Sequence, residues 1–133
     1  MFVKGLYATI SIWNDFLGGF NNAIDFCTRL ANRAGYLLTS SWSTSYLVSP
    51  SLCTTFMCIR LPNSFVANVL NVNSIVDLSY NDAEIVQNYL FNEHMIEVPV
   101  KCIQGDLYVR VSCHVYNCIG DYEHLARVVL EKI

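Results

Sequence analysis

Charged residues are scarce in this chain, and their scarcity sets the first limits on what the protein can be. Asp, Glu, Lys and Arg make up 14% of the 133 residues, whereas hydrophobic residues make up 53%. Intrinsic disorder is excluded, because disordered segments combine low hydrophobicity with high charge. A free-standing domain usually carries about 25% charged residues, so we expect another protein surface to cover part of this chain.

The chain also lacks a basic region and a long apolar run. Eight Lys and Arg stand against 11 Asp and Glu, for a net charge of −3, so a nucleic-acid surface is not expected. No apolar run approaches the ~20 residues that cross a bilayer. The first thirteen residues are interrupted by Tyr, Thr and Ser, which makes them a poor secretory signal. We therefore expect a cytoplasmic protein that binds neither nucleic acid nor membrane.

Metal-binding spacings are missing as well. The six cysteines contain no Cys-x-x-Cys pair, and the three histidines contain no His-x-x-x-His pair. Cys53 and Cys58 are five residues apart, as are Cys113 and Cys118. On a strand, an odd separation points two side chains to opposite faces, so neither pair chelates one metal readily. We interpret the cysteines as small buried hydrophobic residues, and we expect no metal site.

Hydrophobic periodicity divides the chain into helices and strands. Residues 1–19 are apolar and aromatic and end in Gly18-Gly19. Beyond them the patterns predict a helix over 20–42, a strand over 52–61, a loop over 63–79, a helix over 81–94 capped by Asn81 and Glu84, strands over 96–103 and 107–116, and a helix over 121–132. The last two strands are expected to form a hairpin around Gln104-Gly105-Asp106. This order predicts an α/β (α+β) fold whose small sheet packs its apolar face on the helices.

The strand over 107–116 alternates strictly between apolar and polar residues. Its polar face is expected to carry Tyr108, Arg110, Ser112, His114 and Tyr116. An arginine in the middle of a strand needs a partner, and its planar fork of donors matches a carboxylate with two parallel hydrogen bonds. Two interpretations stay open: a solvated face with Arg110 paired to Glu97 or Asp106, or an anion-binding face directed at a cleft.

Three segments near the end of the chain also resemble a known family. Residues 97–100, 107–117 and 121–125 are similar to the C-terminal end of class V aminotransferase-type, pyridoxal-phosphate-dependent enzymes. The subgroup they resemble most is that of isopenicillin N epimerase-like proteins, which are related to cysteine desulfurases and desulfhydrases. Their Arg-x-Ser-x-x-x-Tyr-Asn signature is matched by Arg110, Ser112, Tyr116 and Asn117. Upstream segments at 12–19, 33–34, 42, 52–53 and 60–62 follow in the same order, so the resemblance spans about residues 8 to 130, and it is weakest at 63–79.

The resemblance implies a domain organisation and a role for each signature residue. Residues 20–133 would be the small C-terminal domain of a fold-type I enzyme, with the long helix as linker, and residues 1–19 a remnant of the large cofactor domain or its linker. Arg110 matches the arginine that grips the α-carboxylate of the amino-acid substrate. Ser112, Tyr116 and Asn117 are expected to support it, and His114 to pack on the sheet face. Family members form homodimers.

The cofactor of the intact family is pyridoxal 5'-phosphate, held by a lysine of the large domain. This chain has only Lys4, Lys101 and Lys132, none of them after Ser or His, and it has no glycine-rich phosphate loop. The family's Gly-Thr segment would fall near Gly5, but Leu6 follows that glycine. We therefore expect no covalently bound cofactor.

Whether the chain is an enzyme by itself therefore stays open. The leading interpretation is a truncated form that is inactive alone and has a missing large domain, or a full-length homologue, as its partner. The alternatives are a non-catalytic interaction chain and a module that binds small carboxylates. The reaction of the intact enzyme stays open among epimerase, desulfurase, desulfhydrase and transaminase types.

Overall fold

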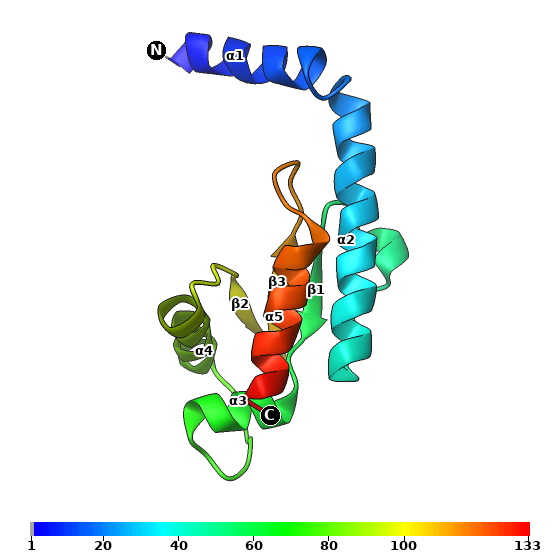
Figure 1. Ribbon diagram of the computed structural model, residues 1–133. Helices are drawn as coiled ribbons and strands as arrows, with labels where there is room; N and C mark the ends of the chain where they lie inside the picture. Colours follow the sequence, from blue (N-terminus) through cyan, green and yellow to red (C-terminus); the bar gives the residue numbers. More distant parts are fainter. Residues whose placement is uncertain (1) are drawn as a thin grey trace.

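A computed structural model describes residues 2–133 as a mixed α+β fold, which confirms the predicted class (Figure 1). In chain order the elements are α1 (Phe2–Asp15), α2 (Phe20–Trp42), the 3₁₀ turn η1 (Pro50–Leu52), β1 (Phe56–Arg60), α3 (Asn63–Leu70), α4 (Tyr80–His94), β2 (Val100–Ile103), β3 (Asp106–Ser112) and α5 (Ile119–Glu131). No helix in this described part of the chain is long and apolar enough to cross a membrane.

The three strands form one antiparallel sheet in the order β1-β3-β2. The predicted hairpin is confirmed, but its turn is one residue shorter than expected: Asp106 is the first residue of β3 and pairs with Ile103, which leaves Gln104 and Gly105 as the turn. These two residues have φ angles of 52° and 81°, the left-handed values that a two-residue hairpin turn requires. Val109 of the central strand β3 lies opposite Val100 of β2 on one side and opposite Ile59 of β1 on the other.

One face of the sheet is covered by helices and forms the core. Met57, Ile59, Leu107, Val109 and Val111 are all buried on this face. Figure 1 shows α5 lying in front of the sheet, with α2 and α4 on its two sides. The helix predicted over 20–42 is confirmed as α2, and its buried residues are Ala23, Cys27, Leu30, Ala31, Ala34, Gly35, Leu38 and Trp42. The expectation that the hairpin packs its apolar face on helices is therefore confirmed.

Gly35 sets how closely α2 approaches the sheet. A Cβ atom at this position would overlap the side chain of Met57 on β1 and the ring of Tyr46. Trp42, at the end of the same helix, donates its indole N–H to the Ala126 carbonyl of α5 at 3.3 Å. The glycine and the indole together fix α2 against both the sheet and α5.

Three local predictions were wrong. Residues 63–70 form the helix α3 rather than a loop, and Pro62 precedes its first turn. The helix is too short for its hydrophobic period to be recognised in the sequence. Burial of Phe65 and Val66 against the rest of the protein stabilises it. The cap of α4 is Ser79, paired with Asp82 in a reciprocal capping box, and not Asn81 with Glu84. The strands are also shorter than predicted, because residues 52–55, 96–99 and 113–116 lie outside the ladder.

Candidate functional site

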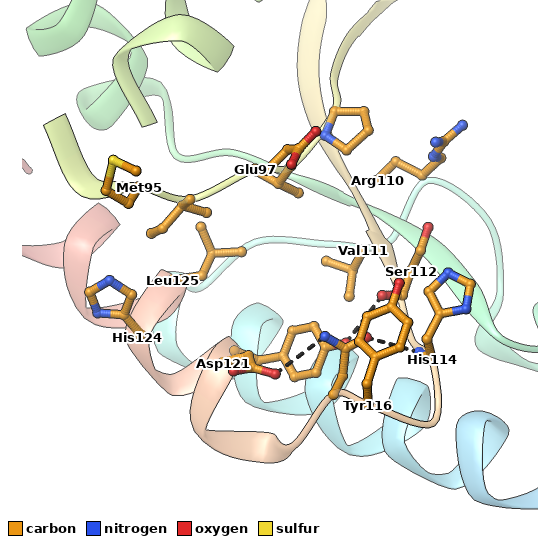
Figure 2. A pocket seen from close by; sticks show the side chains of 15 residues that line it. Met95, Glu97, Arg110, Val111, Ser112, His114, Tyr116, Asp121, His124 and Leu125 are labelled. Atoms are coloured by element: carbon orange, nitrogen blue, oxygen red, sulfur yellow. Dashed lines mark hydrogen bonds between the residues drawn. The ribbon is translucent and has the colours of Figure 1, made fainter. Parts of the chain in front are cut away.

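A cavity of about 650 Å³ opens where β3 ends, between residues 95–99, the loop 112–117 and the start of α5 (Figure 2). All five residues singled out from the sequence, Arg110, Ser112, His114, Tyr116 and Asn117, line it. Its apolar part is formed by Ile96, Val98, Val111 and Leu125. The structure therefore brings the predicted residues together, but it adds a hydrophobic wall from α5 and from the segment before β2.

Arg110 lies in the middle of the central strand, on the face that the helices leave open. Its side chain is exposed, its neighbour across β1 is Cys58, and its backbone N–H donates to the Pro99 carbonyl at 2.8 Å. In Figure 2 the guanidinium stands at the edge of the cavity and points away from Val111 and Leu125. The backbone of this arginine is thus fixed from both sides while its charged group stays accessible.

No acidic residue neutralises Arg110 within residues 2–133. Asp106 forms an ion pair with Arg60 instead, with 2.6 Å between Nη2 and Oδ1. Glu97 lines the same cavity but forms no salt bridge with Arg110 in the described part of the chain. The interpretation that Arg110 pairs with Glu97 or Asp106 is therefore wrong.

A network of hydrogen bonds holds the loop after β3 against α5. The His114 N–H donates to Asn117 Oδ1 at 2.9 Å, and Asn117 Nδ2 donates to Asp121 Oδ2 at 3.3 Å. The same carboxylate oxygen accepts the Cys118 N–H at 2.9 Å, in the manner of a capping box. Asn117 therefore links the loop to the helix rather than reaching toward the cavity with a free amide.

His114 and Tyr116 form an aromatic pair at the cavity. Their rings stack with centroids 5.1 Å apart and an angle of 17° between the planes. Both side chains are exposed, Tyr116 by 79%.

The strand β3 ends at Ser112, beside the first turn of α5. The Ser112 backbone carbonyl accepts a hydrogen bond from the Tyr122 hydroxyl at 3.2 Å. The expectation that His114 packs on the sheet face is not met, because the strand ends at Ser112 and the histidine lies in the loop.

Burial makes three titratable groups near the site harder to deprotonate, namely Cys58, Cys113 and Tyr122. Burial raises the pKa of the Cys58 thiol, an effect that the Arg110 guanidinium partly offsets. Burial is also the main cause that raises the pKa of the Cys113 thiol. The pKa of the Tyr122 hydroxyl lies well above its ordinary value, mainly because of burial and further because of a hydrogen bond with Cys113. None of these three groups is a ready nucleophile or base.

Sequence reasoning did not single out Met95, Glu97 or His124 as cavity residues. His124 lies on α5, and its Nδ1 accepts a hydrogen bond from Arg127 Nη2 at 2.8 Å. The helical period of residues 121–132 shows which residues of α5 are buried, but not that its first turns face the segment 95–99. This contact joins residues far apart in the sequence, and no local pattern contains it.

The lysines and the cysteines lie away from a catalytic arrangement. None of the three lysines lines the cavity: Lys4 is exposed on α1, Lys101 lies over the Tyr80 ring and Lys132 over the Tyr89 ring. The residues present at the cavity therefore do not fit the covalent attachment of pyridoxal phosphate. Of the six cysteines that we expected to be buried, Cys27 and Cys113 are buried, Cys53, Cys58 and Cys102 are half-buried, and Cys118 is exposed. Within residues 2–133 no three His, Cys, Asp or Glu side chains gather as a metal site.

Comparison with known proteins found one informative similarity. No protein-family profile matches the chain. It is similar to an L-cysteine desulfhydrase of Arabidopsis thaliana, with 27% identity over 135 residues. The match covers 90% of this chain but 28% of that protein, so the chain spans less than a third of the length of this relative.

Proposed function

We propose that this chain is the small C-terminal domain, in truncated form, of a pyridoxal-phosphate-dependent enzyme of the class V aminotransferase type. Within that class we assign it to the isopenicillin N epimerase-like and cysteine desulfhydrase-like enzymes that act on amino acids. Its own contribution is a binding residue: Arg110 holds the α-carboxylate of the substrate. The 27% identity to a desulfhydrase over 90% of the chain supports the class.

The observation that carries the role of Arg110 is an accessible guanidinium on a fixed backbone beside a cavity, with no acidic partner among residues 2–133. A planar guanidinium offers two parallel N–H donors, which fit the two oxygens of a carboxylate. β1 pairs with Arg110 on one side, and on the other side the Pro99 carbonyl, just before β2, accepts the Arg110 N–H. The fixed backbone therefore places the exposed guanidinium beside the cavity, where an anion can reach it.

The chain alone supplies binding and not the reaction. Because no lysine lines the cavity, the group that holds the cofactor has to come from a larger domain or from a full-length homologue. We infer that the complete site forms between this chain and such a partner, and that the isolated chain is inactive. The intact enzyme is expected to be a homodimer.

A chimera tests this proposal. The segment of the Arabidopsis desulfhydrase that matches this chain is replaced by the chain, and desulfhydrase activity toward L-cysteine is measured. We expect an active chimera whose kcat/KM falls at least about tenfold with Arg110→Ala or Arg110→Lys, because a hydrogen bond to a charged group contributes about 1.5–3 kcal/mol. The control is Arg33→Ala, which removes an exposed arginine of α2.

Three results would contradict the proposal. The first is a folded, cofactor-loaded chimera without activity. The second is an Arg110→Ala chimera that keeps the full kcat/KM. The third is an Arg110→Ala chimera that loses its cofactor, since the arginine is proposed to hold the substrate and not the phosphate.

A second candidate function is a stand-alone module for small carboxylates. The cavity favours it, because residues 95–125 of this chain form all of it. The test is a titration of the isolated chain with L-cysteine and with cysteamine, which lacks the carboxylate. Binding of L-cysteine alone, lost with Arg110→Ala, would support the module; equal or absent binding of both would contradict it.

A further inference from the structure

Two residues of opposite charge line the cavity, and neither has a charged partner among residues 2–133. Arg110 forms no salt bridge in this part of the chain, and Glu97 forms none either. Figure 2 shows their side chains along one edge of the cavity, with Asp121 on the opposite side. A ligand that satisfies both charges has to present a negative group and a positive group.

The second acidic residue of the cavity, Asp121, is already engaged. Its Oδ2 accepts the Cys118 N–H at 2.9 Å, so this carboxylate caps the start of α5. His124 is engaged as well, because its Nδ1 accepts a hydrogen bond from Arg127 at 2.8 Å. Glu97 is therefore the acidic residue of the cavity whose carboxylate can meet a ligand without breaking a helix cap.

The backbone around Glu97 is fixed on both sides. Just after α4 ends, the Ile96 N–H donates back to the Leu90 carbonyl at 3.0 Å, which closes the end of the helix. On the other side the Pro99 carbonyl accepts the Arg110 N–H at 2.8 Å. Glu97 therefore extends from a fixed position at the edge of the cavity and not from a free loop.

The alternation of burial places Glu97 on the same face as Arg110. Val98 and Val100 are buried, whereas Glu97 is exposed. Val100 lies opposite Val109, which is buried too, and the next residue of β3 is the exposed Arg110. Because successive side chains of an extended segment point to opposite faces, both charges belong to the open face of the sheet.

We propose that Glu97 determines which side-chain charge the site accepts: it favours amino acids with a positively charged side chain and disfavours acidic ones. This inference rests on the proposed function, in which Arg110 holds the α-carboxylate and the α-amino group is taken up by the cofactor of the larger domain. The side chain of the substrate is then the part left to face Glu97. Its methylene groups can lie on the apolar wall at Ile96 and Leu125 while its charged end reaches the carboxylate.

Competitive inhibition of the chimera, with L-cysteine as substrate, tests the inference. L-Ornithine, L-norleucine and L-glutamate have side chains of similar length that are positive, neutral and negative. We expect a Ki for ornithine about two- to five-fold below that for norleucine, and a Ki for glutamate above it by a similar factor, as for an exposed charge pair. About 0.5 M salt should reduce both differences, because it screens exposed charges.

Substitutions of Glu97 assign this ranking to one carboxylate. Glu97→Gln is expected to remove the ranking by charge, and Glu97→Lys to reverse it. The matched control is Glu93→Gln, which alters an exposed glutamate of α4 that does not line the cavity and should leave the ranking unchanged. Urea unfolding checks that each variant is folded, and Glu97→Gln decides alone if Glu97→Lys unfolds the chain.

The same three ligands are also titrated into the isolated chain and followed by NMR, because residues 95–125 form all of the cavity. A ranking that Glu97→Gln leaves unchanged, or that Glu93→Gln alters equally, would overturn the inference while the effect of Arg110→Ala on activity still supports the proposed function. An inactive chimera would contradict the proposed function instead. The titration then decides on Glu97, and the absence of a ranking by charge there would overturn the inference as well.

Discussion

Arg60 and Asp106 form an ion pair on the open face of the sheet, with 2.6 Å between Nη2 and Oδ1. Arg60 lies opposite Tyr108 in the β1–β3 register, so Asp106 is its diagonal neighbour. Arg110 lies four residues further along β3, about 13 Å away at the usual rise of a strand. The pair therefore uses the one acidic residue of β3, and Arg110 forms no ion pair within the described residues.

Arg110→Ala is expected to leave the stability of the isolated chain within about 0.5 kcal/mol of the wild type. The reason is that its side chain is exposed and forms no ion pair in the described residues. Urea unfolding provides the measurement. Val109→Ala, at the adjacent and fully buried position, is the control and should cost about 2 kcal/mol. A large loss with Arg110→Ala would show that the arginine is structural.

Gly35→Ala is expected to destabilise the fold by about 1–3 kcal/mol, because a Cβ atom there overlaps Met57 and Tyr46. Helix propensity alone predicts the opposite sign, a gain of up to about 1 kcal/mol. The control is Gly5→Ala in α1, where the added Cβ atom meets no neighbour. Thermal unfolding of both variants separates the two effects, and a stabilised Gly35→Ala chain would contradict the close packing.

Ser79→Ala is expected to cost about 1 kcal/mol at neutral pH, since Ser79 caps α4. Hydrogen bonds from Ser79 hold the pKa of Asp82 below its ordinary value in the folded chain. A lowered pKa contributes stability above the unfolded value of about 4, and this contribution is lost as the pH falls through the folded value. The difference in the free energy of unfolding between the wild type and Ser79→Ala should therefore become smaller as the pH falls.

Asn81→Ala is the control for the cap, because Asn81 lies in the first turn without a capping hydrogen bond. Urea unfolding at pH 7 and at pH 3 measures both variants. Two results would be inconsistent with the capping box. One is a loss of unfolding free energy with Asn81→Ala as large as that with Ser79→Ala. The other is a difference in unfolding free energy between the wild type and Ser79→Ala that does not change with pH.

Pyridoxal phosphate mixed with the isolated chain and treated with borohydride is expected to give no stoichiometric adduct at one lysine. None of the three lysines lies at the cavity, and Lys101 and Lys132 lie over tyrosine rings. Peptide mass spectrometry locates any reduced adduct. Complete modification of a single lysine would show that the chain can hold the cofactor by itself.

The sequence by itself determined the elements with a clear period. The alternation of residues 107–112 fixed which side chains of β3 face the helices, and the glycine-containing turn located the hairpin. That Asp106 pairs with Ile103, which makes the turn two residues long, came from the structure. The hydrophobic periodicity of residues 20–42 predicted the helix α2, which spans Phe20–Trp42. These features depend on backbone geometry over a few residues, which sequence spacing records directly.

Only the tertiary structure decided the rest. It made residues 63–70 helical by burying Phe65 and Val66, and it gave Asp106 to Arg60, 46 residues away, rather than to Arg110. It also placed Glu97 and His124 beside the predicted site residues. Burial, ion pairing and cavity shape depend on which distant segments meet, and that choice follows from the packing of the whole core rather than from any local pattern.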